Sequence, residues 1–419
     1  MIRMELNLGR FLLALSTWLD WSADGLNAHQ RRVACASAAM AAHVGADPAI
    51  VERTFAAAVI HDLGAVKNAE RLDLQRFDVE HTLPHCLRGA QMVAEASVLS
   101  GLGNIVLHHH DKWAGRNPGG VQGTEIPVEA RIIHVCDRVA VLSSPDSYIL
   151  TQRGEIVERV KSLRGKAFDP DMVEAFQDLA AHESFWLDMT MPEWGLEALP
   201  DMPGLSVELP AEGIRQLAGV AAYAVDAKSR FTYRHSHGVA GTSRMLGEIM
   251  GLAAERCLLL ETSGLLHDIG KLTVPDQILE KEGPLTPDEI SIIRGHTYYT
   301  YWFLVDAGFD VAMAEWAAFH HERLDGRGYP FGVDDSRLDL EHRIIAVADI
   351  YTALREDRPY RPGMPWPEIE KVLWSQVKSG AIDGDVVTAL LNAKPEADRR
   401  WEELTLASAA RLVDEGEEQ

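Results

Sequence analysis

An internal repeat constrains the fold of this 419-residue chain more than any other feature of its sequence. The first half contains HDLG at residues 61–64, and the second half contains HDIG at residues 267–270. In each half another histidine, His29 or His235, lies 32 residues before the His-Asp pair. Self-similarity at fixed spacing indicates two copies of one folding unit.

The repeat continues after the His-Asp pairs. In both copies a histidine lies 24 residues before a His-His pair, and a segment of the form RII-x-V-x-D follows. The spacing differs only between the His-Asp pair and the next histidine, where it is 24 residues in the first copy and 29 in the second, which carries GPLTPDE. These positions are His85, His109, His110 and Asp137 in the first copy and His296, His320, His321 and Asp349 in the second.

Helical periodicity dominates the rest of the chain. Residues 38–64 are rich in alanine with apolar residues at helical spacing, and Asp47-Pro48 is typical of a helix start. Sustained β-branched alternation is absent from the sequence. We therefore predict an all-α fold of two tandem helical domains. The expected parts are a first domain at 1–190, a proline-rich linker at 191–204, a second domain at 205–400 and an acidic tail at 401–419.

Charge narrows the classes of ligand. Lys and Arg number 40 against 63 Asp and Glu, a net charge of -23, and such a field disfavours long nucleic acids and anionic membranes as partners. The four cysteines have no CxxC spacing, which favours buried, reduced thiols. No apolar run reaches membrane-spanning length, and the run at 11–15 is soon followed by aspartates. These features predict a cytoplasmic protein with a small-molecule ligand.

The second copy carries the stronger candidate site. Seven side chains of metal-ligating type exceed what one tetrahedral ion needs, and they suit two divalent ions that share a carboxylate, with Asp268 as the candidate bridge. A water bridging the two ions would attack phosphorus, and Lys271, on the same helical face as His267, would neutralise a phosphate oxygen. Asp268 and Lys271 are therefore the candidate catalytic residues. The candidate metal ligands are His235, His267, Asp268, His296, His320, His321 and Asp349.

Three motifs of the second copy carry a family resemblance. HDIGK, then HHERLDGRGYP at 320–330, then RIIAVADIYTALREDRPYR resemble the HD-GYP family of bacterial phosphodiesterases over about residues 215–395. The resemblance implies an HD-superfamily helical fold and a non-haem iron or manganese centre, with zinc, nickel and magnesium also open. It further implies hydrolysis of cyclic dinucleotides, above all cyclic di-GMP, to the linear 5′-phosphorylated form. The seven candidate ligands match the family's metal ligands, and Lys271 matches its lysine.

Some positions depart from the family pattern or belong to its substrate side. Members with three metals carry glutamate where this chain has Phe231 and Thr352, so two metals are expected. Asp226 and Lys228 are candidates for the pocket mouth, with an exposed helix end as the equal alternative. By the same resemblance the GYP segment forms a lip over the substrate. The candidate substrate-binding residues are Lys271, Asp325, Gly328, Tyr329, Pro330, Arg358 and Arg361.

The first copy keeps the ligand set without the rest of the site. Ala65 stands where the second copy has Lys271, and HHDKWAGRNPGG replaces the GYP segment. A regulatory or scaffolding domain without cyclic dinucleotide hydrolysis is expected, and both a metal site and a purely structural copy stay open. Its candidate ligands are His29, His61, Asp62, His85, His109, His110 and Asp137.

The tandem arrangement itself resembles bacterial enzymes that act on 3′,3′-cyclic GMP-AMP as well as on cyclic di-GMP. Architecture does not fix a substrate, so both dinucleotides stay open. Two other functions compete with this prediction. One is an HD-type phosphohydrolase acting on other nucleotides, and the other is a non-catalytic cyclic dinucleotide-binding signalling protein. A homodimer and protein partners at the GYP segment are also left open.

Overall fold

The computed structural model describes residues 6–21, 28–79, 81–115, 117, 119–191, 202–228, 233–281, 283–357 and 362–416. The contacts divide the chain into a first unit, Leu6–Glu208, and a second unit that begins at Leu209. Residues 192–201 of the expected linker lie outside the described residues, and residues 202–208 belong to the first unit.

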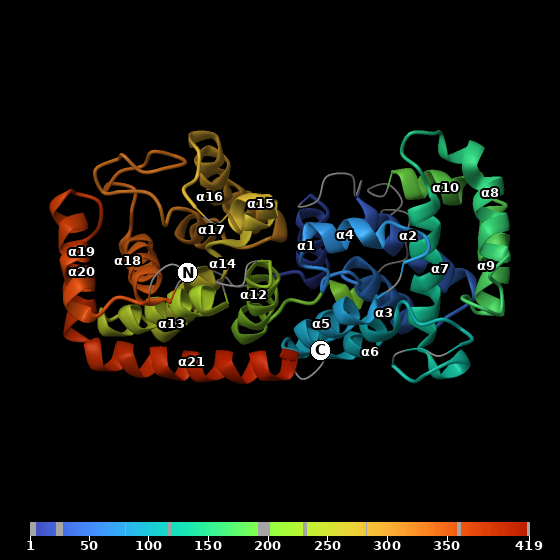
Figure 1. Ribbon diagram of the computed structural model, residues 1–419, viewed down its shortest axis with the longest axis horizontal. Coiled ribbons are helices and arrows are strands. Elements are labelled where there is room, and N and C mark those ends of the chain that lie inside the picture. The colour runs from blue at the N-terminus through green and yellow to red at the C-terminus, as the bar shows by residue number, and fades with distance from the viewer. Residues whose placement is uncertain are drawn as a thin grey trace. The chain divides into compact units, whose positions relative to one another are not determined.

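The first unit is built from helices (Figure 1). Its described helices are α1 (Leu8–Trp21), α2 (His29–His43), α3 (Pro48–Val59), α4 (Asn68–Leu74), α5 (Leu83–Ala94), η1 (Ser97–Leu102), α6 (Gly103–His108), η2 (Gly123–Glu125), α7 (Val128–Leu142), α8 (Ile149–Lys161), α9 (Pro170–Ala180), α10 (Glu183–Thr190) and η3 (Pro203–Leu205). A long connection joins α6 to η2.

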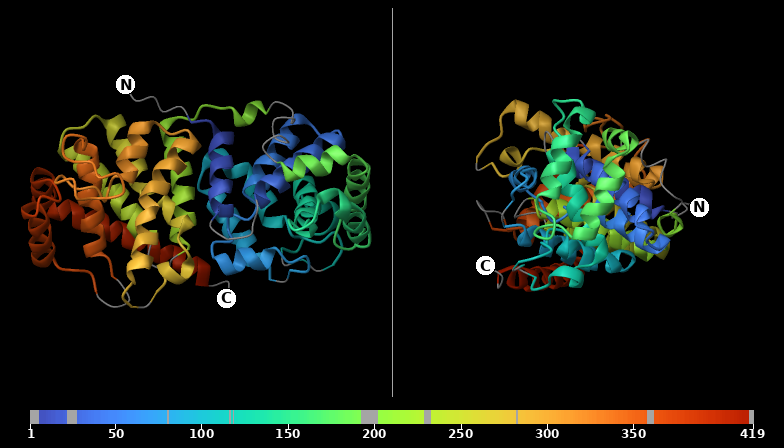
Figure 2. Two further views of the ribbon diagram at one scale, coloured as in Figure 1. Left: turned by 90° about the horizontal axis from the view of Figure 1, so that it is seen from above. Right: turned by 90° about the vertical axis from the view of Figure 1, so that its right-hand side faces the viewer.

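The second unit repeats this pattern, with α16 (Pro287–Ala307) clearly longer than its counterpart α5. Its described helices are α12 (Ala211–Asp226), α13 (Tyr233–Ile249), α14 (Ala254–Leu266), η4 (Ile269–Thr273), α15 (Asp276–Leu279), α16 (Pro287–Ala307), α17 (Val311–Ala318), α18 (Leu340–Arg355), α19 (Trp366–Lys378), α20 (Gly384–Asn392) and α21 (Lys394–Gly416). The expected acidic tail therefore continues α21 as far as Gly416, and in both views α21 runs along its own unit, where it packs against α13 (Figures 1 and 2).

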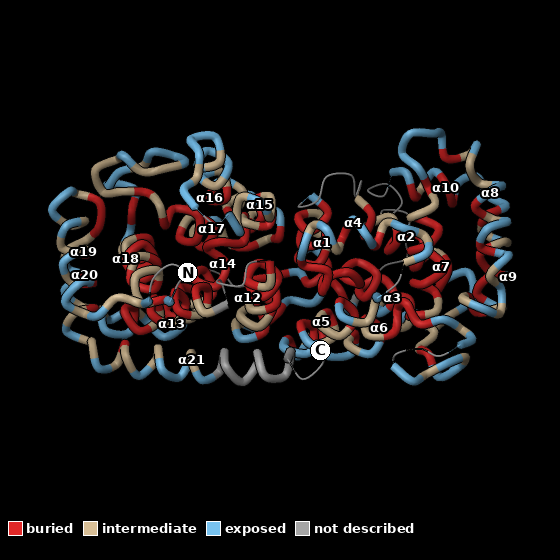
Figure 3. Tube along the Cα trace, in the orientation of Figure 1, coloured by how far each residue is buried: buried red, intermediate tan, exposed pale blue. Residues whose placement is uncertain are grey.

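The same pairs of helices pack together in the two units. α2 packs against α3 and α7, and in the same way α13 packs against α14 and α18. In each unit the buried residues face these inner helices, whereas α8, α9, α19 and α20 expose their outer sides (Figure 3). Because each unit has its own buried core, the repeat in the sequence corresponds to two folding units.

The predicted all-α fold is confirmed. The described residues contain only two isolated β-bridges, Asn7 with Glu208 and Arg164 with Phe168, and no β-sheet. No helix in the described part of the chain is both long enough and apolar enough to cross a membrane.

Candidate metal centre and active site

Close helix packing brings the first two histidines of the second unit together. Gly264 of α14 faces Ala240 of α13 so tightly that a Cβ on the glycine would lie 2.9 Å from the Ala240 Cα. Residues without bulk let two helix backbones approach, and this contact lies one turn before His267. As a result, Nε2 of His267 is 3.3 Å from Nε2 of His235.

The turn after the His-Asp pair is pressed against α16. A Cβ on Gly270 would overlap the carbonyl oxygen of His296, so the position requires glycine. Thr300, one turn after His296, accepts a hydrogen bond from the Gly270 amide at 3.1 Å and donates to the His267 carbonyl at 2.9 Å. Together these contacts fix the His-Asp turn relative to the helix that carries the third histidine.

The Asp268 carboxylate lies at the centre of the site. Its Oδ2 is 3.2 Å from Nε2 of His267, and its Oδ1 is 3.2 Å from Nε2 of His296. His235 lies on the Oδ2 side and His320 on the Oδ1 side, at 3.7 and 4.0 Å. The two oxygens thus face two different groups of histidines, as a bridging carboxylate would.

Asp349 on α18 adds a second carboxylate between the same groups. Its Oδ1 is 3.2 Å from Nε2 of His235, and its Oδ2 is 3.9 Å from Nδ1 of His321. All seven side chains predicted from the sequence therefore lie in one cluster. It contains two groups of potential ligands, His235 with His267 and Asp268, and His296 with His320 and His321.

The histidine rings are oriented to hold a cation. The Nδ1 atoms of His267, His296 and His320 each lie 2.5–2.8 Å from the carbonyl three residues earlier, so each ring donates there and turns Nε2 toward the cluster. The Nε2 atoms of His296 and His320 are 3.3 Å apart, which sets two lone pairs against each other. Metal–nitrogen bonds of about 2.1 Å at a tetrahedral angle span roughly this distance. The cluster therefore fits a bound divalent ion.

Nearby charges and burial favour the metal-binding protonation states of Asp268 and His321, respectively. Burial by itself would raise the pKa of Asp268, but the charges of His267 and Lys271 outweigh it and lower that pKa well below its usual range. Burial lowers the pKa of His321 to about 4. An ionised carboxylate and a neutral imidazole are the forms that bind metals.

One side of the cluster is open. The Lys271 side chain is 22% exposed, and its Nζ donates to Asp268 Oδ2 at 2.5 Å. The His321 side chain is 33% exposed, and the Tyr329 ring lies 5.0 Å from it. The Arg294 guanidinium stacks over the Tyr329 ring, 4.3 Å from its centre. A lysine, an arginine and an aromatic ring thus surround the approach to the cluster.

Glu322 holds the GYP segment in place. Its Oε1 accepts hydrogen bonds from the amides of Phe331 and Gly332 at 2.7 and 3.1 Å, and a Cβ on Gly328 would overlap the Glu322 backbone. The sequence reasoning did not assign Glu322, Thr300 or Arg294. The acidic residue directly after the His-His pair was the available signal for Glu322.

The structure describes some of the remaining residues that were predicted to bind substrate or to be compared with the family's extra metal ligands, but not all of them. Asp325 accepts hydrogen bonds from the Arg323 side chain and the Arg327 amide, so its carboxylate is used within the lip. Pro330 is exposed next to Tyr329. Arg358, Arg361 and Phe231 lie outside the described residues, and Thr352 is buried.

The prediction that Asp226 and Lys228 lie at the pocket mouth is wrong. Both residues are buried. Lys228 Nζ donates to the carbonyls of Leu272 and Val274 at 2.8 and 2.7 Å, and Asp226 accepts from Ser236 Oγ at 2.9 Å. A buried lysine needs such partners, and here it fastens the segment that follows Lys271.

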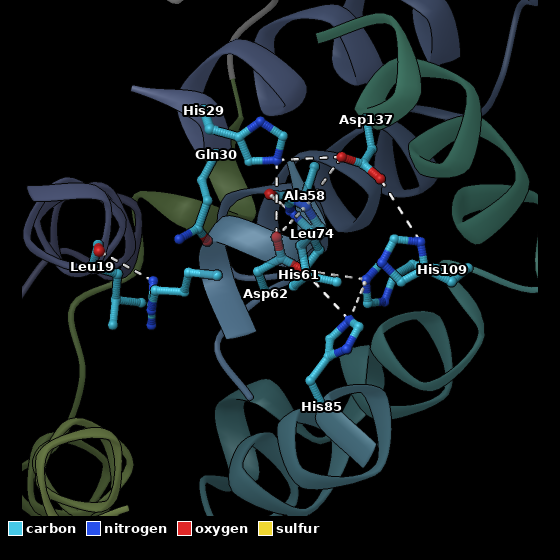
Figure 4. Close-up of polar contacts among 12 residues, drawn as sticks. Leu19, His29, Gln30, Ala58, His61, Asp62, Leu74, His85, His109 and Asp137 are labelled. Atoms are coloured by element: carbon cyan, nitrogen blue, oxygen red, sulfur yellow. Dashed lines mark hydrogen bonds and ion pairs between the residues drawn. The ribbon is translucent and has the colours of Figure 1, made fainter. Parts of the chain in front are cut away.

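The first unit assembles its seven predicted ligands in the same way (Figure 4). Asp62 Oδ2 is 3.3 Å from Nε2 of His61, and Asp62 Oδ1 is 3.5 and 3.6 Å from Nε2 of His85 and His109. Asp137 Oδ1 lies 3.2 Å from Nε2 of His29. His110 completes one group with Asp62, His85 and His109.

The chain resembles known proteins along most of its length. Residues 27–142 and residues 220–386 each match an HD domain. The 3′3′-cGAMP-specific phosphodiesterase 1 of Vibrio cholerae is 34% identical over 349 residues, which cover 80% of each chain. The chain belongs to the HD-GYP family.

Other relatives match a smaller part of the chain or show the fold alone. The cyclic di-GMP phosphodiesterase response regulator RpfG of Xanthomonas campestris is 35% identical over 47% of this chain and 52% of its own. A solved cyclic GMP-AMP specific phosphodiesterase of V. cholerae superposes with a TM-score of 0.64 at 22% identity, covering 93% of this chain and 98% of that one. The helical fold is therefore shared with a solved structure.

Proposed function

We propose that this HD-GYP chain is a metal-dependent phosphodiesterase that hydrolyses a cyclic dinucleotide to its linear 5′-phosphorylated form. The Asp268-centred cluster carries the proposal, because its two oxygens face two groups of histidines and the cluster opens beside Lys271. His235, His267, Asp268 and Asp349 would hold one ion, and Asp268, His296, His320 and His321 the other. When bound, a pair of iron or manganese ions would acidify a shared water and polarise the phosphate.

The residues of the chain supply the remaining steps. Lys271 would release Asp268 when the ions bind and donate to a phosphate oxygen, where negative charge grows during the reaction. Tyr329 would cover the substrate on the His321 side, and Arg294 would keep the Tyr329 ring in place. Glu322 would fix the backbone of the lip, so that the substrate meets a preformed surface.

We further propose 3′3′-cGAMP as the preferred substrate over cyclic di-GMP. Two relatives that match 80% and 74% of this chain are both 3′3′-cGAMP-specific phosphodiesterases of V. cholerae. Two cyclic di-GMP phosphodiesterases, RpfG of X. campestris and PA4108 of Pseudomonas aeruginosa, match 47% and 40% of this chain. Similarity that spans both units therefore favours the mixed dinucleotide.

The test is product analysis with protein purified without oxygen and supplied with iron or manganese. Each cyclic dinucleotide is incubated with the wild-type chain and with Asp268→Asn, and the products are separated by chromatography. Linear dinucleotide from the wild type alone supports the proposal. Intact substrates with the metal-loaded wild type would overturn it, as would hydrolysis of unrelated nucleotides at a higher kcat/KM. A higher kcat/KM for cyclic di-GMP would overturn the substrate preference only.

A further inference from the structure

The cluster of the first unit differs from the active site in its access to solvent. The side chains of His110 and Asp137 are 5% and 1% exposed, compared with 33% and 11% for His321 and Asp349 at the matching positions. Ala65, which replaces Lys271, is fully buried. The first cluster therefore keeps the ligands but has no open side at these positions.

Arg138 fixes Asp137 at one side of the first unit's cluster. Its guanidinium donates to Asp137 Oδ2 through Nε and Nη2 at 3.0 and 2.7 Å. The same group donates to the carbonyls of Leu74, Arg76 and Phe77, which end α4 and follow it, at 3.1, 2.7 and 3.3 Å. Asp137 is thus held in one orientation, in which Oδ1 faces His29.

The cations of the two units differ in their freedom to move. Lys271 contacts Asp268 from a partly exposed position on a flexible stem, so it can leave when a metal or a phosphate arrives. Arg138 is 4% exposed and anchored by three backbone carbonyls, and its planar group cannot leave without breaking all of them. A fixed guanidinium can orient a metal ligand but cannot follow a substrate.

The segment after His110 is also fastened. Asp111 Oδ2 lies 2.7 Å from Nδ1 of His108, and a Cβ on Gly119 would lie 2.9 Å from the same ring. The amides of Trp113 and Ala114 donate to the carbonyls of Ala167 and Lys166 at 2.9 and 2.8 Å. The second unit makes a matching contact from the Leu324 amide to the Ala381 carbonyl at 3.2 Å, so both units hold this segment, and only the second places the Tyr329 ring beside its cluster.

Two further observations point to a ligand inside the closed cluster. The buried Nε2 of His110 has no hydrogen-bond partner among the described residues. Nε2 of His85 is 3.4 Å from Nε2 of His109, whose Nδ1 already lies 2.6 Å from the Val106 carbonyl. A divalent cation satisfies such buried nitrogen and carboxylate donors together.

We propose that the first unit holds a divalent metal ion in a closed, slowly exchanging centre that cross-links its helices and takes no substrate. The ligands come from α2, the turn after α3, α5, the segment after α6, and α7. Binding would therefore stabilise the packing of this unit, and Arg138 is the positioning residue that keeps the centre closed.

Metal release from the full-length chain tests the proposal. The wild type, Asp62→Asn and Asp268→Asn are loaded with Zn(II) as the probe, and release to an excess of a chromogenic chelator is followed by stopped-flow and manual mixing. The expected wild-type trace has a fast and a slow phase. Asp268→Asn loses the fast phase and keeps the slow one, whereas Asp62→Asn loses the slow phase.

Arg138→Gln tests the positioning role, with Arg131→Gln as its matched control. Arg131 lies on the same helix and pairs with Asp169 away from the cluster. Arg138→Gln is expected to speed the slow phase by roughly 10–100-fold, the usual effect of losing a group that orients a metal ligand, while Arg131→Gln leaves it unchanged. If Arg138→Gln fails to fold, Arg138→Lys, which keeps the charge but not the planar fork, is measured in its place.

Three outcomes would overturn the inference. They are an Asp268→Asn chain that takes up no metal, a slow phase that survives in Asp62→Asn, and a release rate that neither Arg138 variant changes. None of these readouts involves a substrate. Failure of the hydrolysis proposal would therefore leave the metal-release result standing, and failure of the metal-release test would leave hydrolysis standing.

Discussion

The two units carry the same seven potential ligands in the same order but surround them differently. In the second unit the fifth histidine of the cluster, His321, is one-third exposed, and a lysine stands beside the central aspartate. In the first unit the matching histidine is buried, alanine replaces the lysine, and an arginine fixes the last aspartate. A retained ligand set therefore predicts metal binding in both units, whereas hydrolysis also requires an open side and a cation that can move.

The largest expected effect separates the two central aspartates. Asp268→Asn should abolish hydrolysis, because one carboxylate that faces both groups of histidines is lost. Asp62→Asn should reduce kcat far less, since its cluster has no access for substrate. Steady-state kinetics of the two full-length variants measures the difference. Equal losses of kcat would break the comparison, because the first unit would then take part in catalysis.

The second effect concerns the movable cation. Lys271→Met keeps the length of the side chain and removes its charge, so it should lower kcat by roughly 10²–10³-fold, as for the loss of one donor to a developing charge. Metal content, measured by elemental analysis, should stay at the wild-type level because no ligand is changed. A loss of metal that paralleled the loss of kcat would show that Lys271 acts by shaping the centre.

The fold class and the residues that converge in each unit could be predicted from the sequence alone. The 32- and 24-residue spacings carried this information because ligands on separate helices must keep their positions relative to the helix ends. The spacing differs, 24 against 29 residues, because α16 starts nine residues before His296 and α5 only two before His85, while the stretch from the His-Asp pair to the helix start is two residues shorter in the second unit.

Contacts between distant segments could not be predicted in the same way. Lys228 is polar and lies at the end of a helix pattern, yet it is buried because carbonyls 44 and 46 residues away accept its hydrogen bonds. The role of Arg138 depends on the carbonyls of residues 74–77, which no local pattern links to it. The one sequence signal was the arginine directly after Asp137, where the second copy has Ile350.

The two His-Asp turns are expected to be under the same steric constraint. A Cβ on Gly270 would overlap the His296 carbonyl, and a Cβ on Gly64 would overlap the His85 carbonyl. Alanine at either position should destabilise its own unit by about 1–3 kcal/mol, the usual cost of overpacking. Hydrogen exchange of α14 and α16, or of α3 and α5, would locate the loss. Gly270→Ala alone should also lower kcat.

The smallest effect concerns the segment that only the second unit has. The Thr286 hydroxyl accepts from the Glu289 amide at 3.2 Å, and Glu289 accepts from the Thr286 amide at 2.7 Å, which forms a capping box at the start of α16. Thr286→Ala should cost about 1 kcal/mol of stability. His296 lies more than two turns further along α16, so kcat should hardly change.

Denaturant unfolding of the full-length Thr286→Ala chain, followed by hydrogen exchange, measures this cost and its location. Faster exchange should be confined to the first turns of α16, and Ser291→Ala on the same helix serves as the control because its hydroxyl donates to a carbonyl within the helix. A large drop in kcat from Thr286→Ala would show that the added helical turns position His296. The longer α16 would then be a fourth feature, with the open side, the movable lysine and the lip, that separates the hydrolytic unit from the closed one.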